Sequence, residues 1–168
     1  MDSRRSALDL VFEVASAVAL LAAIADVGMH WSVLPDRIPV HFGAAGNPNA
    51  WGGKSMLLWL LATTVAMAIL LTVAESYQRL INIPMNVDRD SPAVRRLLRS
   101  MVIAMKAAIT VSFLWIVDST MKTAVGAADG LGRAFLPVFA GAIGVPVVYC
   151  LVKLNGLRRS GRSTGLRR

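Results

Sequence analysis

The residues best suited to chemistry lie in or beside one polar, turn-rich interval, residues 34–55, between two long apolar runs. Two histidines and three carboxylates are expected at similar depth there: Asp26, His30, Asp36, His41 and Asp118. Asp26 and His30 are four residues apart, so they share one face of a helix. Nitrogen and oxygen donors of these types can form a zinc-type site.

The spacing of these residues favours a structural role over catalysis. The histidines do not form a HExxH motif, and neither Ser32 nor Ser55 is accompanied by a nucleophile-elbow or oxyanion glycine pattern. We therefore expect no catalytic residues, metal or cofactor. Instead, His41 is expected to hold the shape of the interval by donating to a loop carbonyl or to Asp36. We also expect His41, Asp36 and Trp51 to pack together.

A second candidate site lies inside an apolar run. Lys106 falls about nine residues into its predicted span, where a lone charge is costly in hydrocarbon. Glu13, at a similar depth in the first span, is within reach of a lysine side chain. We predict an ion pair that fixes helix register rather than a proton or ion relay, because one isolated pair is not a pathway.

These residues must be positioned by membrane-spanning helices. The chain of 168 residues is 55% hydrophobic and only 17% charged, with a mean hydropathy of +0.58. Its apolar runs are each about 20 residues, the length that crosses a bilayer as a helix. The predicted spans are 8–30, 55–75, 97–118 and 133–153. The fold class is therefore all-α, a four-transmembrane-helix bundle with a structured loop between the first two helices.

The loop itself is expected to contain neither a helix nor a long strand. Its prolines fix φ and remove backbone donors, and its glycines permit backbone angles closed to other residues. Ser91 and Pro92 predict a helix start ahead of the third span, with Ser91 as the cap and Pro92 in the first turn.

Basic residues are distributed unevenly between the two sides of the predicted spans. Thirteen Lys and Arg residues flank the spans on one side and four on the other, so the positive-inside rule places both termini in the cytoplasm and the 34–55 loop outside. Several arginines are expected to contact lipid phosphates or a partner: Arg95, Arg96, Arg99, and, in the predicted tail 154–168, Arg158, Arg159, Arg162, Arg167 and Arg168. A basic tail after a membrane helix favours lipid or an acidic neighbour over nucleic acid.

The loop also carries a recognisable order of residues, Pro-Asp-x-Ile-Pro-x-His-Phe followed by Gly-x-Pro-x-x-Trp-x-x-Lys. The matching positions are Pro35, Asp36, Ile38, Pro39, His41, Phe42, Gly46, Pro48, Trp51 and Lys54. This order resembles the hallmark of the SdpI-like membrane proteins, a bacteriocin-immunity family whose N-terminal part is a domain of unknown function, the 1648 family. Asn49 departs from the Asp that members of that family often carry. The resemblance implies a fold type and a membrane location more firmly than an activity.

Two functions follow as expectations. The first is a non-catalytic accessory or structural subunit that packs against a larger bacterial membrane complex, respiratory or photosynthetic in type. The alternative, which the resemblance implies, is an immunity or signalling protein that binds a secreted peptide toxin at the outer loop. In either case we expect a multi-pass protein of the bacterial cytoplasmic membrane, with lipids and other membrane subunits as partners.

Overall fold

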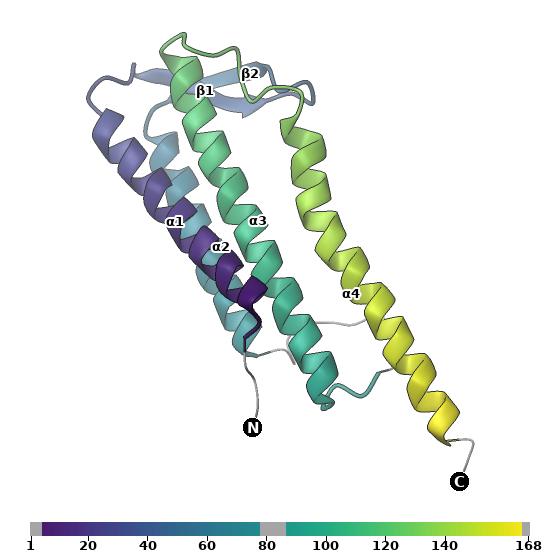
Figure 1. Cartoon of the computed structure of the whole chain (residues 1–168). Coiled ribbons are helices and arrows are strands. Elements are labelled where there is room, and N and C mark those ends of the chain that lie inside the picture. Colours follow the sequence, from purple (N-terminus) through teal and green to yellow (C-terminus); the bar gives the residue numbers. More distant parts are fainter. Residues whose placement is uncertain (1–4, 78–86, 166–168) are drawn as a thin grey trace.

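The computed structural model describes residues 5–77 and 87–165, with side chains described as far as Arg159. Within these ranges the elements follow in the order α1 (Ala7–His30), β1 (Arg37–Phe42), β2 (Pro48–Gly53), α2 (Met56–Ser76), α3 (Pro92–Ala124) and α4 (Phe135–Gly165). These four helices are long and apolar enough to cross a membrane. α1, α2 and α3 run side by side, the strands lie across one end, and α4 runs alongside α3 (Figure 1).

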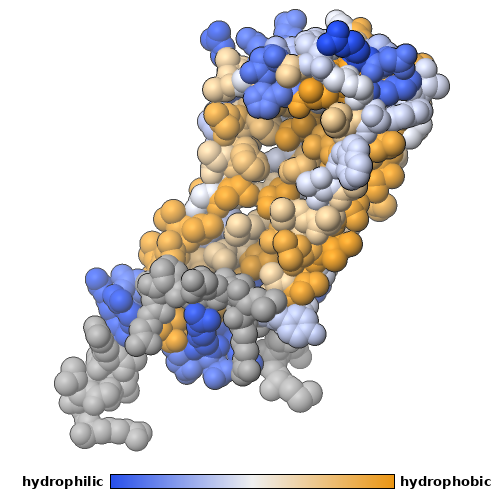
Figure 2. Space-filling model, turned by 180° about the vertical axis from the view of Figure 1, so that it is seen from behind, coloured by the Kyte–Doolittle hydropathy of each residue, from blue (hydrophilic) through white to orange (hydrophobic). Residues whose placement is uncertain are grey.

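The surface has the polarity profile of a multi-pass membrane protein. On the face shown in Figure 2, hydrophobic residues form a band across the middle of the helices, and hydrophilic residues gather at both ends. Hydroxyls within the band donate back to the carbonyl four residues earlier, as Thr64 does to Leu60 at 2.8 Å and Thr72 to Ala68 at 2.8 Å. These bonds satisfy polar atoms that hydrocarbon cannot solvate.

Local sequence explains where two of the helices begin. Ser6 and Asp9 form a capping box at the start of α1, in which each side chain accepts from the other residue's backbone N–H. α3 begins at Pro92, as predicted, because a proline in the first turn removes no helical hydrogen bond. Ser91 occupies the cap position, but its side chain makes no capping bond.

The helices α3 and α4 extend beyond their predicted bounds, because hydropathy marks only the part of a helix that crosses lipid. α3 has 33 residues, more than the roughly 20 needed to cross the hydrocarbon core. α4 continues past the predicted end of the fourth span at residue 153, through Gly165. Much of the predicted tail is therefore helical.

The chain is mostly helical, as predicted, but the loop contains a small sheet of two six-residue strands that the all-α prediction did not include. β1 and β2 pair as an antiparallel hairpin, with Arg37 opposite Gly53 and Pro39 opposite Trp51. A two-stranded sheet has only edge strands, so the missing N–H of Pro39 is tolerated. The register is irregular between Pro39 and His41 and again between His41 and Phe42.

The core lies around α3, which packs against α1, α2, α4 and β1. One buried cluster fills the space beneath the hairpin: Val27, Leu34, Ile38, Leu57, Val117 and Met121. A smaller cluster joins α3 to α4 near their other ends: Val94, Leu98, Cys150 and Leu154. α4 thus depends mainly on α3 for its place in the fold.

Glycines close the hairpin against the segment that joins α3 to α4. Leu131 N donates to Gly46 O at 2.9 Å, and Gly46 has a φ of 85°, in the left-handed region. A Cβ on Gly46 would lie 2.6 Å from the Gly132 carbonyl oxygen, and one on Gly130 would lie 2.1 Å from the Gly46 oxygen. We call the hairpin 37–53 together with segment 126–134 the hairpin cap.

Replacing Gly46 with Ala is expected to destabilise the cap by roughly 1–2 kcal/mol from backbone strain alone, with the backbone contact adding to that cost. Limited proteolysis of the purified protein should cut the cap faster in this variant. Gly141→Ala is the matched control, because a Cβ there meets nothing within 4 Å. Equal cleavage rates in the Gly46 variant and the control would show that the close contact does not hold the cap.

Candidate functional site

The hairpin cap is fixed to the helices by its first strand. Ile38 is 1% exposed and joins the buried cluster between α1, α2 and α3, and Pro39 is also fully buried. Leu34, just before the strand, packs in the same cluster. The two residues that follow this buried pair, Val40 and His41, are exposed. The motif therefore forms a surface anchored from below.

Lys54 joins the two ends of the hairpin. Its backbone N–H donates to Asp36 O at 3.0 Å, and its Nζ lies 3.3 Å from the Asp36 carboxylate. Nζ also lies 3.5 Å from Leu34 O and 5.6 Å from the centre of the Trp31 ring. Because the Asp36 side chain is 96% exposed, this ion pair contributes little to stability by itself. It orients the hairpin on the helices.

His41 has a different partner from the one predicted. Its Nδ1 is within hydrogen-bonding distance of the Asn49 side-chain oxygen, across the hairpin. The prediction that His41 bonds Asp36 or a loop carbonyl is therefore wrong. The irregular register pairs His41 with Ala50 and leaves Asn49 next to it, while Asp36 lies before the strand, beside Lys54. Phe42 and Pro48 are half-buried at the far end of the strands, and Pro35 is exposed.

The other polar residues predicted at this end divide into separate pairs. His30 Nδ1 lies 3.0 Å from the Asp26 carboxylate, and Lys122 Nζ donates to Asp118 at 2.8 Å. Asp26 and Asp118 share the lining of a pocket of about 490 Å³ between α1 and α3. Within the part of the chain that the structure describes, no three His, Cys, Asp or Glu side chains lie close enough to hold a metal ion.

Apolar side chains remain exposed on and around the cap. Trp51 on β2 is 45% exposed and Val40 on β1 is 40% exposed. Val33 and Val125, in the segments beside the hairpin, are 66% and 55% exposed. Trp51 combines a large contact area with an indole N–H, a combination common in protein interfaces. This arrangement suits binding to another surface.

The second candidate site is a buried ionic centre between α1, α2 and α3. Lys106 Nζ lies 2.8 Å from Glu13 Oε1 and 3.1 Å from Glu75 Oε2, and it also donates to Thr72 Oγ1 at 3.1 Å. The Lys106 and Glu75 side chains are 5% and 4% exposed, and that of Glu13 is 21% exposed. The structure thus brings the predicted pair together and adds a second carboxylate.

Further polar contacts continue the ionic centre in both directions. Arg5, just before α1, donates to Glu75 Oε1 at 2.8 Å. One turn past Glu13, Ser16 bonds Thr110 at 3.1 Å between α1 and α3. Sequence reasoning missed Glu75, although it is the only charged residue in the second span. Its position as the one charged residue of that span is the signal that could have identified it.

The predicted arginine contacts have varied surroundings. Arg95 pairs with Asp90, and Arg158 Nη2 donates to Asn155 at 2.9 Å. Arg96 lines a groove beside α4, Arg99 is half-buried and Arg159 is exposed. The side chain of Arg162, and Arg167 and Arg168, lie outside the described residues.

The comparisons with known proteins concern mainly the first half of the chain. A family model described as a domain of unknown function (DUF1648) matches residues 17–66, which include most of α1, the hairpin and the first half of α2. An uncharacterized protein of Archaeoglobus fulgidus is 37% identical over 70 residues, which cover 35% of this chain and 38% of that protein. No solved structure matches.

Replacing Lys106 with Met is expected to cost about 3–5 kcal/mol of unfolding free energy, because it leaves two carboxylates without their shared cation in a largely buried site. Glu13→Gln should cost less, since Glu75 still pairs with the lysine. Thermal unfolding in detergent measures both effects. Combining the two changes should be milder than the sum of the single changes.

Lys122→Met is the matched control, because it removes the cation of an exposed i,i+4 pair on the same helix. The midpoint of its thermal unfolding should barely differ from that of the wild type. A Lys106 variant that is as stable as this control, or strictly additive effects of Lys106→Met and Glu13→Gln, would contradict a structural role for the ionic centre.

Proposed function

We propose that this protein is a non-catalytic accessory subunit that holds a neighbouring membrane protein through its hairpin cap. The observation that carries the proposal is a preorganised cap with exposed apolar side chains. Ile38 anchors it from below, Lys54 fixes its ends and Gly46 closes it against the α3–α4 segment. A rigid surface loses little conformational entropy on binding. Within the cap, His41 pairs with Asn49 across the hairpin.

A second candidate uses the same surface with a different partner. The resemblance of the 34–55 motif to SdpI-like proteins supports an immunity or signalling role, in which the cap binds a secreted peptide toxin. The DUF1648 match includes this segment, and its description names no activity. Asn49, which bonds His41, stands at the position where many SdpI-like members carry Asp. The partner of His41 in this chain is therefore an uncharged amide rather than a carboxylate.

We further propose that the cap faces outward from a bacterial cytoplasmic membrane. The start of α1 and the end of α4 lie at the end of the bundle opposite the cap (Figure 1). Thirteen Lys and Arg residues flank the spans on that side and four on the cap side. This asymmetry supports cytoplasmic termini.

Cysteine labelling tests this orientation in a Cys150→Ala background. A maleimide that cannot cross the membrane should modify a cysteine placed at Ala45 in intact cells. It should modify one placed at Ser163 only after the cells are opened. The reverse pattern would show that the cap faces the cytoplasm.

Trp51→Ala tests the accessory function. On a native gel of solubilised membranes, the wild-type protein should migrate in a complex, and the variant should shift substantially to its own size because a buried interface Trp commonly contributes at least ~2 kcal/mol. Trp59→Ala is the matched control, since Trp59 is 70% exposed on the lipid-facing surface of α2. If the wild-type protein migrates by itself, without a partner, the accessory role is refuted. If deletion of the gene then sensitised cells to a secreted peptide toxin, the second candidate would replace it.

A further inference from the structure

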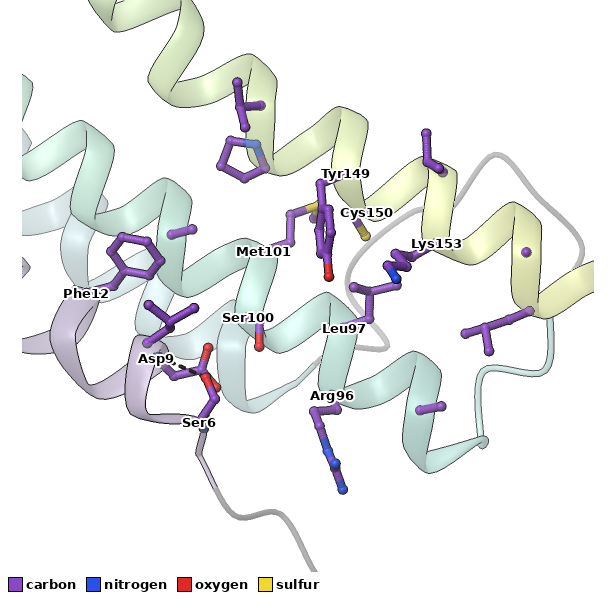
Figure 3. A pocket seen from close by; sticks show the side chains of 18 residues that line it. Ser6, Asp9, Phe12, Arg96, Leu97, Ser100, Met101, Tyr149, Cys150 and Lys153 are labelled. Carbon is purple, nitrogen blue, oxygen red and sulfur yellow. Dashed lines mark hydrogen bonds between the residues drawn. The ribbon is translucent and has the colours of Figure 1, made fainter.

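A groove opens between α4 and the paired helices α1 and α3, at the end of the bundle where α1 begins (Figure 3). Its volume is about 910 Å³, near the top of the usual range for ligand pockets, about 300–1,000 Å³. Most of its lining is apolar, including Phe12, Leu97, Met101 and Val145. Neighbouring side chains such as Val145 and Val152 are 68% and 65% exposed, so the groove is accessible from the hydrocarbon side.

Two cations lie at the polar end of this groove. Arg96 on α3 and Lys153 on α4 both line it, and Lys153 extends from α4 toward α3 (Figure 3). Among the described residues, neither has a carboxylate partner. Five other basic residues do have one: Arg5, Lys54, Arg95, Lys106 and Lys122. The groove therefore pairs an apolar wall with positive charge that the described protein leaves uncompensated.

The one carboxylate in the lining, Asp9, already accepts a hydrogen bond at the start of α1. Its side chain accepts from Ser6 N at 2.9 Å in the capping box of α1, and the residue is 3% exposed. Asp9 is thus not positioned to neutralise Lys153 across the groove. Polar hydroxyls of Ser100 and Tyr149 also line the space, and Lys153 Nζ lies 5.7 Å from the centre of the Tyr149 ring.

We propose that this groove binds an anionic phospholipid. The phosphate would lie at the polar mouth between Lys153 and Arg96, with the Arg96 side chain rotating inward from the direction shown in Figure 3. One acyl chain would lie along the apolar wall of α3 and α4. Along the membrane normal, a phospholipid has its anionic headgroup at the surface and its apolar chain deeper, which matches the cations at the polar mouth and the apolar wall beyond them. An apolar helix in the groove would instead bury both cations without a counter-charge. The bound lipid would fill the space between α4 and α1.

Native mass spectrometry of the purified full chain tests the proposal. The protein is exchanged into detergent with equal amounts of phosphatidylglycerol, which is anionic, and phosphatidylcholine, which is zwitterionic. It should retain one phosphatidylglycerol in preference to phosphatidylcholine. Lys153→Gln and Arg96→Gln should each lower that retention about fivefold, the loss expected for one basic residue near an anionic surface.

Arg95→Gln and Arg158→Gln are matched controls, because they remove the same charge from the same two helices outside the groove. Retention should be unchanged in both. Equal losses in all four variants, equal retention of the two lipids, or a lipid-free dimer that excludes phosphatidylglycerol would overturn the proposal.

A mapping experiment keeps the proposal testable if a groove variant misfolds, which the helical circular dichroism signal would reveal. Phosphatidylglycerol with a photoreactive diazirine on its acyl chain is added to the unmodified protein and activated by light. Cross-links should fall on peptides that contain Met101 and Tyr149. Cross-links spread evenly over the exposed faces of α1 and α2 would show ordinary solvation by lipid and contradict a site in the groove.

Discussion

The fold depends on placing one lysine inside an apolar bundle. Lys106 is 5% exposed in its side chain and needs counter-charges that only neighbouring helices can bring to it. Glu13 and Glu75 meet that need from α1 and α2 at 2.8 and 3.1 Å. Since apolar side chains pack about equally well in several registers against lipid, this ionic centre is the interaction that makes one register preferable.

The same constraint separates the protein into a fixed part and a less constrained part. α1, α2 and α3 are joined by the ionic centre at one end and by the cluster around Ile38 beneath the hairpin at the other. The cap is held rigidly because Ile38 packs in that cluster. α4 shares neither feature, packs mainly against α3 and leaves the groove that we assign to a phospholipid. The proposed binding of a partner at the cap and the proposed binding of lipid in the groove therefore involve different parts of the molecule.

Sequence reasoning predicted the features that hydrocarbon imposes directly. Four apolar helices and the nearness of Lys106 to Glu13 follow from span length and the cost of a lone charge. It failed where pairing between distant residues decides the outcome. Proline and glycine argued against a long strand in 34–55, yet burial of Ile38 and Pro39 against the helices favours a hairpin whose two short strands are both edges. The contact of His41 with Asn49 arises where the register is irregular, with Ala50 opposite His41. Hydropathy could not show how far α4 extends beyond lipid.

A disulfide between α1 and α3 tests the central claim most directly. Ser16 and Thr110 hydroxyls are 3.1 Å apart, one turn beyond Glu13. With Cys150 replaced by Ala, cysteines at these two positions should form an intramolecular disulfide rapidly and nearly completely on mild oxidation in the membrane, since such proximity suits disulfide geometry. Adding Lys106→Met should slow that reaction markedly. No disulfide in the presence of Lys106, or one that forms equally fast without it, would contradict the claim that the ionic centre sets helix register.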